Sequence, residues 1–405
     1  MKAIFYLLIN LFIIIFIFYS TTHAQSDPLA KLWGVNDTDL PMYLTREKNL
    51  TNLDKTLTQY LDNSNFGGTW VDVNANKVFI NTIDPSKVSN ISSLPEIKPY
   101  IDLLIFKPAN NSLQQLSVVF DQIKQLSIDK NAVDIYFYVD ISLNNIAIYL
   151  EQNEGDDKNK EFINATKQYN PILIYQPSDD SPTMKQQTTI KRQTPVTEVL
   201  CGDGLLTKEL ILCSAGFFAK DLNDTIYVVT TGHCYHENLT NFFFYFPWGT
   251  KRTTVLIGRM TKYSIKNYDY GLINFRGIAP KPIRAKPIVR NTDSNICKEL
   301  LIHDTTQVSS HGVHLCKSGH ESHATCGYVK GFNGIYINEV AFATDLIITD
   351  TLAEEGDSGG PAYFYENLCS VSLNGIITAG TKGILTILPL EIILRDANIE
   401  PIINS

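Results

Sequence analysis

One serine of the chain stands in a setting that suits nucleophilic attack on an acyl carbon. Ser358 lies within the segment GDSGGP at 356–361, with glycines on both sides. Glycines permit a tight turn that exposes the hydroxyl, lets a substrate chain approach and points backbone N–H groups at a developing oxyanion. A serine hydroxyl reacts at neutral pH only when a neighbouring base accepts its proton. The segment therefore predicts a nucleophile if a base lies near it, and an ordinary turn if none does.

A base and a carboxylate that could orient it occur upstream. His233 lies in TTGHC at 230–234, directly after a strand-like run, and Asp269 lies in YDYGLI at 268–273. A carboxylate that enters an apolar strand is costly to bury without a partner, and an imidazole that it orients is such a partner. The chain order His, Asp, Ser is one of the orders known for this triad. We therefore expect His233, Asp269 and Ser358 to form a hydrolytic triad.

The three motifs together resemble those of chymotrypsin-like serine proteases. DYG at 269–271, with CKSG at 316–319 and the CG that follows it, is similar more narrowly to the streptogrisin and alpha-lytic protease branch. The resemblance spans roughly residues 205–399 and implies an all-β mature region of two six-stranded antiparallel barrels with a C-terminal helix. It also implies a serine-type endopeptidase without metal or organic cofactor, whose oxyanion hole is formed by the N–H groups of Gly356 and Ser358.

Two other functions could use the same fold and residues. A catalytically inactive homologue would bind or regulate other proteins, but such proteins typically lack a member of the triad, and all three members are present here. An esterase would use the same triad on a simpler acyl bond. The order and context of the motifs favour peptide cleavage, with proteins or peptides as substrates.

Seven cysteines occur, all of them from Cys201 onward. Cysteines of secreted proteins tend to pair, and an odd number leaves at least one outside an internal disulfide. The resemblance implies two disulfides: Cys213–Cys234 and Cys316–Cys326. Three cysteines stay unassigned: Cys201, Cys297 and Cys369.

A zinc site is the alternative for one of these cysteine pairs. Cys316, His320, His323 and Cys326 have metal-binding side chains at compact spacing. In an oxidising compartment the two cysteines would rather pair with each other, so we expect no metal.

The residues around the nucleophile also suggest a substrate preference. In this family the residue six before the nucleophile often lies at the base of the main specificity pocket, which here is Leu352, followed by Ala353. We expect Thr378 and Gly380 to form one wall, so that the pocket accepts large apolar side chains. The family often has a cysteine shortly before the nucleophile. This chain has none there, so the resemblance does not assign the walls of the pocket. Two acidic residues stand there instead and could favour a basic side chain: Glu354 and Glu355.

The N-terminus has the pattern of a secretory signal peptide. Lys2 is followed by 16 mostly apolar residues, 3–18, and then by Thr22-His23-Ala24, which predicts a cut after Ala24. An uncleaved membrane anchor is the alternative, but it needs about 20 apolar residues. We therefore expect a secreted, extracellular protein without a membrane anchor after removal of residues 1–24. Seven glycosylation sequons support this route: Asn36, Asn49, Asn90, Asn110, Asn164, Asn223 and Asn238.

Between the signal peptide and the triad lies a region without cysteines. Residues 25–192 alternate strand and helix signals, including a hairpin around 74–76 and a helical period from 113 to 126, which is typical of an α+β domain. FGGTWVD at 66–72 is similar to the pro-domains of the same protease branch, so we expect a propeptide that assists folding and inhibits the enzyme. A permanent binding domain is the alternative.

A polar segment, 176–198, separates this region from the rest. It contains Lys191-Arg192, and a dibasic pair in an exposed segment predicts processing after Arg192. We therefore divide the chain into a signal peptide, a propeptide with its linker, and a protease domain of residues 193–405. From residue 200 onward, strand-like runs such as 210–218 and 340–349 dominate until a helical period at 388–397.

The charge of the chain excludes one class of partner. Of the 405 residues, 42 are acidic and 34 are Lys or Arg, which gives a net charge of −8. Nucleic-acid binding requires clustered basic residues, and the sequence has no long basic run. We expect a monomer whose partners are its substrates and its own propeptide.

Overall fold

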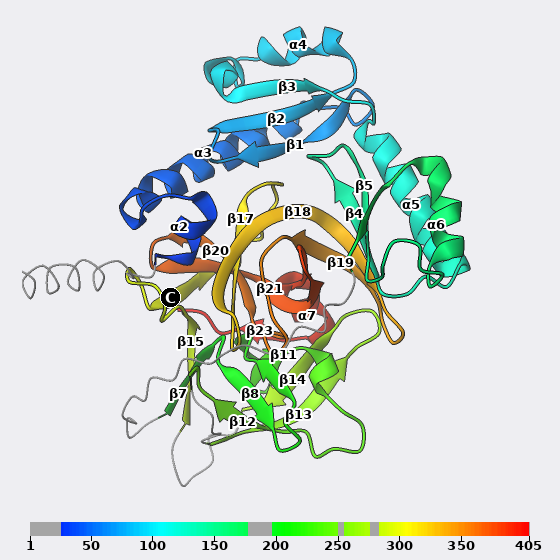
Figure 1. The fold of residues 1–405 in the computed structure, drawn as a ribbon. Helices are drawn as coiled ribbons and strands as arrows, with labels where there is room; N and C mark the ends of the chain where they lie inside the picture. The colour runs from blue at the N-terminus through cyan, green and yellow to red at the C-terminus, as the bar shows by residue number, and fades with distance from the viewer. Residues whose placement is uncertain (1–25, 177–196, 250–254, 276–282, 405) are drawn as a thin grey trace, which may run out of the picture.

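The computed structural model describes residues 26–176, 197–249, 255–275 and 283–404. The predicted signal peptide with its cut after Ala24, and the predicted processing site at Arg192, lie outside these residues. The described chain consists of an N-terminal region, residues 26–176, and a C-terminal region, residues 197–404 (Figure 1). In the parts that the structure describes, no helix has the length and apolarity to span a bilayer.

The N-terminal region contains both helices and strands. One sheet has the order β1-β2-β3 and packs on α3, while β4 and β5 pack on α5, which also contacts α6, and β6 pairs with β5 (Figure 1). The elements are α2 (Pro28–Trp33), α3 (Leu40–Thr58), β1 (Phe66–Asp72), β2 (Lys77–Thr82), α4 (Val88–Ser92), β3 (Leu104–Pro108), α5 (Leu113–Asp129), β4 (Ile135–Asp140), β5 (Asn145–Leu150), α6 (Lys160–Thr166) and β6 (Ile172–Tyr175). Short 3-10 turns connect them: η1 (Asp37–Asp39), η2 (Pro85–Lys87), η3 (Lys98–Leu103) and η4 (Lys167–Tyr169).

Local sequence explains the boundaries of several of these elements. Helix α5 begins with a capping box, in which the Ser112 side chain accepts from the Gln115 backbone and the Gln115 side chain accepts from the Ser112 backbone. Its buried apolar residues, Leu116 and Ile123, are two turns apart and face the sheet. The hairpin of β1 and β2 turns at Asn76, whose φ of 54° is a left-handed conformation that Asn tolerates.

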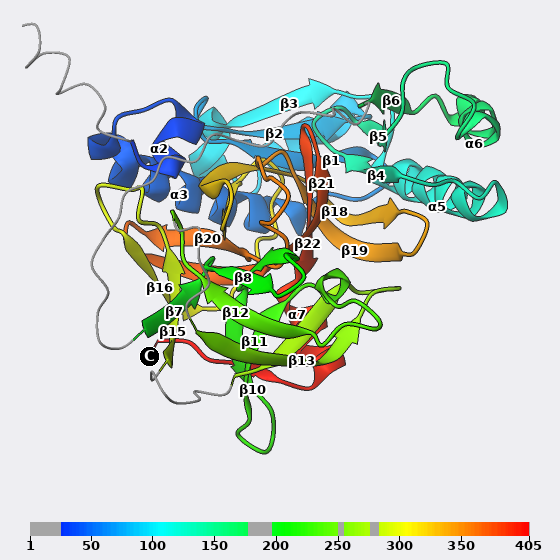
Figure 2. The same cartoon turned by 60° about the horizontal axis from the view of Figure 1, so that its bottom comes forward.

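The first half of the C-terminal region forms a sheet of eight strands with the order β23-β10-β11-β14-β13-β12-β8-β9. Its strands are β8 (Gly204–Thr207), β9 (Leu212–Ser214), β10 (Phe217–Lys220), β11 (Ile226–Thr230), β12 (Phe242–Phe246), β13 (Leu256–Ser264), β14 (Tyr270–Asn274) and β23 (Glu400–Pro401). The last strand shows that the chain's end returns to this first sheet, beside β10 (Figure 2).

The second half forms another sheet around β17, β18, β20 and β21, with β19 and β22 off its main path. Its elements are β7 (Thr197–Cys201), β15 (Ile283–Arg290), β16 (Glu299–Asp304), β17 (His314–Gly319), β18 (His323–Ile337), β19 (Phe342–Thr349), β20 (Pro361–Asn367), β21 (Ser370–Thr381), β22 (Ile384–Pro389) and helix α7 (Leu390–Ala397). The C-terminal region is thus mostly β with a C-terminal helix. Strands of the N-terminal region extend only this second sheet, and the closure into two barrels of six strands each stays a prediction.

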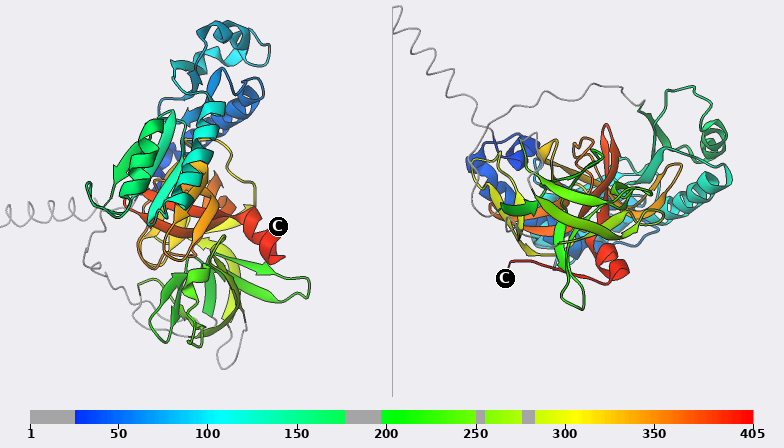
Figure 3. Two further views of the ribbon diagram at one scale, coloured as in Figure 1. Left: turned by 90° about the vertical axis from the view of Figure 1, so that its right-hand side faces the viewer. Right: turned by 90° about the horizontal axis from the view of Figure 1, so that it is seen from below.

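The N-terminal region joins the second sheet directly. Strand β4 pairs antiparallel with β18, placing Tyr136 opposite Tyr336, so β4, β5 and β6 extend that sheet to twelve strands (Figures 1 and 3). A second contact runs from β1, where the Val71 N–H donates to the His311 carbonyl at 2.9 Å. Gly312, with a φ of 77°, permits this approach, because a Cβ there would lie 2.1 Å from the Val71 oxygen.

Candidate active site

Strand pairing brings the predicted base and carboxylate together. His233 lies in the 3-10 turn η5 (Gly232–Cys234) directly after β11, and Asp269 directly precedes β14. These two strands are neighbours. The two side chains meet with 2.6 Å between His233 Nδ1 and Asp269 Oδ2, while the His233 N–H donates to Asp269 Oδ1 at 2.9 Å. Both carboxylate oxygens of Asp269 therefore bind His233. When Nδ1 carries the imidazole proton, Nε2 can accept a second proton.

The environment tunes His233 toward accepting a proton. Burial lowers the pKa of its imidazole, but the charge of Asp269 and its hydrogen bond outweigh this effect and raise the pKa above 6.5. The imidazole keeps 41% of its surface exposed, compared with 14% for the Asp269 carboxylate, so solvent weakens the effect of burial. The ring is thus a stronger base than an isolated histidine.

The turn that contains Ser358 is fixed by backbone hydrogen bonds. The Asp357 N–H donates to the Glu354 carbonyl at 3.0 Å, and the Ser358 carbonyl accepts from the Ser214 N–H at 2.8 Å. Gly356 has a φ of 104°, a conformation that side chains rarely adopt. Ser358, His233 and Asp269 line the same cavity of about 440 Å³. The three expected triad residues therefore share one site.

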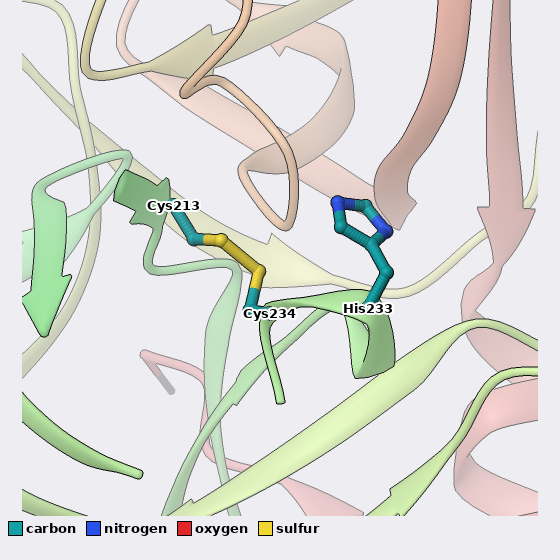
Figure 4. A group of neighbouring side chains, drawn as sticks. All are labelled: Cys213, His233 and Cys234. Atoms are coloured by element: carbon teal, nitrogen blue, oxygen red, sulfur yellow. A yellow bond between two sulfur atoms is a disulfide. The ribbon is translucent and has the colours of Figure 1, made fainter. Parts of the chain in front are cut away.

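A disulfide anchors the segment that contains His233. Cys213 of β9 is bonded to Cys234, the residue after His233, and the imidazole stands beside this bond (Figure 4). The three side chains are close enough to hold a metal ion, but both sulfur atoms are bonded to each other and so are not thiolate ligands. The disulfide also fixes β9, whose last residue is Ser214.

The second implied disulfide is present as well. Cys316 and Cys326 are bonded across the paired strands β17 and β18. Their sulfur atoms are therefore not available to the alternative zinc site with His320 and His323. The structure also joins Cys297 to Cys369, and it leaves Cys201 as a buried thiol whose pKa burial raises.

Asp357, next to Ser358, is fully buried and paired with Lys317 of β17. Lys317 Nζ lies 2.8 Å from Asp357 Oδ2. Burial raises the pKa of Asp357, but the charge of Lys317 and several hydrogen bonds outweigh this effect and lower it below its usual value. The carboxylate is therefore charged, and the lysine is the partner that the sequence did not identify.

Three of the four residues expected in the specificity pocket line this cavity. Ala353, Thr378 and Gly380 line it, whereas Leu352 does not and keeps 65% of its surface exposed. The Leu352 carbonyl accepts from Thr325 Oγ1 at 2.6 Å, a contact that fixes its backbone outside the cavity. Further apolar side chains line the cavity, among them Ile377, Ala379, Ile384 and Leu385. Two of the cavity-lining acidic residues come from the turn that contains Ser358: Glu354 and Glu355.

The N-terminal region also contributes to this cavity, which the sequence did not predict. Tyr136 of β4 and Glu151 line it, and the Tyr136 hydroxyl lies 2.7 Å from Glu151 Oε1. The Tyr136 ring stacks on Tyr336 of β18, with 4.4 Å between ring centroids. Nothing in the sequence near these residues indicates a site, because only the pairing of β4 with β18 brings them there.

Comparison with solved structures gives a structural likeness. No protein-family model matches the chain. Among solved structures the chain is similar to chymotrypsin-like serine proteases of bacteria.

Three of these structures show the extent of the likeness. Protease A of Thermobifida fusca is 19% identical and matches 51% of this chain and 100% of its own, with a TM-score of 0.40. Cellulomonas bogoriensis chymotrypsin is 22% identical over 51% of this chain and 100% of its own, also with a TM-score of 0.40. The alpha-lytic protease homolog N4 is 19% identical over 50% and 98%, with a TM-score of 0.40.

Proposed function

We propose that residues 193–405 are a secreted serine endopeptidase of the chymotrypsin type, with His233, Asp269 and Ser358 as its triad. The observation that carries this proposal is the His233–Asp269 pair in one cavity with Ser358, on a turn fixed by backbone hydrogen bonds. The disulfides support an oxidising, extracellular location.

The geometry suits acyl transfer through a covalent intermediate. Ser358 Oγ attacks the peptide carbonyl as His233 Nε2 takes its proton, and Asp269 stabilises the imidazolium that forms. The N–H groups of Gly356 and Ser358 hold the oxyanion. The imidazolium then gives its proton to the leaving amine, and water, activated by the same histidine, hydrolyses the acyl-enzyme.

We also propose that residues 25–192 are a propeptide removed after Arg192. Tyr136 and Glu151 line the cavity of the triad, so the docked N-terminal region restricts access of a substrate. Strand β4 pairs with β18, which gives the C-terminal region a template for a long strand. Sheets built from distant segments form slowly, and such a template would assist folding.

The cavity supports a preference for large apolar side chains before the cut bond. Its inner walls include Ile377, Ile384 and Leu385. Glu354 and Glu355 also line it, and an acidic group there would favour basic residues elsewhere in the substrate.

The experiment that tests this function compares Ser358→Ala with the wild type on casein and on a simple ester. Ser358→Ala should lower kcat on the order of 10⁶-fold, and His233→Ala should add little to it, because triad members act as a unit. Ser309→Ala, at an exposed serine, is the control and should keep full activity. Cleavage of the ester alone would indicate an esterase, and cleavage of neither substrate would indicate an inactive homologue. Casein cleavage by Ser358→Ala at the wild-type rate would refute the triad.

A further inference from the structure

Two of the seven glycosylation sequons lie on the proposed protease. Asn223 stands in the turn between β10 and β11, and Asn238 stands in the loop between η5 and β12; both are exposed. The other sequons belong to the N-terminal region and would leave with it if it is removed as a propeptide: Asn36, Asn49, Asn90, Asn110 and Asn164. Only Asn223 and Asn238 would therefore remain on the protease.

The loop that contains Asn238 stays close to the expected catalytic base. Asn238 follows His233 in the sequence by five residues, and five extended residues span at most about 18 Å between Cα atoms. The Leu239 N–H donates to the His236 carbonyl at 3.3 Å, which closes a turn around Asn238. This turn shortens the path, so Asn238 lies closer to His233 than the extended limit.

A buried asparagine fixes this loop from the inside. Asn241 is 1% exposed, and its Oδ1 accepts from the His236 N–H at 3.0 Å. Its Nδ2 donates to the carbonyls of His236 and Leu239 at 2.9 Å and 3.0 Å. One side-chain amide thus binds three backbone groups of the loop, which gives the loop a defined conformation.

The sequon itself faces solvent. Asn238 has a φ of 68°, a left-handed conformation that Asn tolerates. Thr240, the third residue of the sequon, is exposed as well. A glycan on the Asn238 amide therefore has room in the folded protein, beside the segment that positions His233.

We propose that Asn238 carries an N-linked glycan, and that this glycan hinders protein substrates while short peptides still reach the triad. In the secretory route a transferase would take the sugar chain from a lipid diphosphate carrier. The Asn238 side-chain nitrogen bonds to C1 of the first sugar and loses one proton, and the lipid diphosphate leaves. N-linked glycans are bulky and lie on the surface, so one attached within about 18 Å of His233 obstructs a large substrate. The effect on substrates rests on the proposed function.

Thr240→Ala is the variant that the structure favours for the test. It breaks the sequon but keeps Asn238, whose left-handed backbone would disfavour a glutamine. Because Thr240 is exposed, alanine there should leave the fold unchanged. Thr240→Ser keeps the sequon and should behave as the wild type.

The matched control is Asn223→Gln, which removes the other sequon of the C-terminal region. Asn223 precedes β11, whereas His233 follows the opposite end of that strand. The turn between β10 and β11 also projects away from the rest of the protein (Figure 2). Loss of a glycan at Asn223 should therefore leave cleavage unchanged.

Occupancy and activity are measured on the same secreted proteins. Each variant is expressed as the full chain in a eukaryotic host, and a peptide glycosidase in water labelled with heavy oxygen converts each glycosylated Asn into labelled Asp. Mass spectrometry should find the label at residue 238 of the wild type. Thr240→Ala should raise kcat/KM on casein at least about threefold and leave kcat/KM on a short chromogenic peptide unchanged, because a surface glycan obstructs only large substrates.

The outcomes separate this inference from the proposed function. An unlabelled residue 238 in the secreted wild type would overturn the modification. Equal ratios of casein to peptide cleavage in the wild type and Thr240→Ala would overturn the hindrance, as would the same rise in Asn223→Gln. If Thr240→Ala is not secreted, wild type that is deglycosylated after folding takes its place. Absence of peptide cleavage by the wild type would refute the proposed function and the hindrance, whereas the label at residue 238 would still decide the modification.

Discussion

Glu47→Gln should loosen the N-terminal region from the C-terminal region. Glu47 of α3 and His314 of β17 are both fully buried where the two regions meet. The His314 N–H donates to Glu47 Oε1 at 2.8 Å, and Nδ1 contacts Oε2. His314 Nε2 accepts from the Tyr365 N–H at 2.9 Å, so the ring is neutral and its Nδ1 carries the proton. One carboxylate therefore accepts two buried donors.

The expected loss of stability follows from the two hydrogen bonds that Glu47 accepts. Glutamine has the same shape, but its amide group would face one of the two His314 donors, and that donor would lose its acceptor. An unpaired buried donor costs about 1–3 kcal/mol. At about 1.4 kcal/mol per factor of ten, the open form should become roughly 5 to 150 times more populated.

Hydrogen exchange followed by mass spectrometry measures this opening. Ser358→Ala would serve as the background, since it blocks any self-cleavage, and peptides covering α3 and β17 would report the opening. Glu96→Gln, the same change at an exposed residue of the N-terminal region, is the control. Protection of β17 that differs by less than about twofold between Glu47→Gln and its background would contradict the argument, which assigns at least about fivefold.

Two further predictions concern the proposed catalysis. Because Asp269 raises the pKa of His233, kcat/KM should fall about tenfold per pH unit below a midpoint that lies above pH 6.5. Asp269→Asn should lower this midpoint and reduce kcat about 10⁴-fold. A midpoint that Asp269→Asn leaves unchanged would contradict the role of Asp269. On chromogenic peptides that differ only in the residue before the cut bond, Phe, Tyr, Leu or Met should be cleaved faster than Arg or Lys; the reverse order would indicate that Glu354 or Glu355 selects a basic side chain in the pocket.

Local patterns in the sequence predicted the elements that depend on neighbouring residues. The helical period from 113 to 126 corresponds to α5, and the period at 388–397 corresponds to α7, Leu390–Ala397. The expected strand at 210–218 is instead two strands, β9 and β10, with Gly216 between them. A Cβ at Gly216 would lie 2.5 Å from the Gly359 oxygen, so this long-range contact requires glycine between the two strands.

The candidate site likewise has a part that local sequence predicts and a part that it does not. Short sequence motifs identify each member of the expected triad, His233, Asp269 and Ser358, because each motif consists of neighbouring residues. The Cys297–Cys369 disulfide joins residues 72 apart, and no spacing rule predicts such a pair. Lys317 stands 40 residues before Asp357, and only the fold brings the two together.

Labelling with a peptidyl phosphonate tests the central claim most directly. The reagent reacts only with a serine whose proton a neighbouring base removes. We predict one adduct per chain, on the peptide that contains Ser358, and none in His233→Ala, whose base is missing. An adduct on a different residue, or equal labelling of the wild type and His233→Ala, would contradict the assignment of these residues as the catalytic centre.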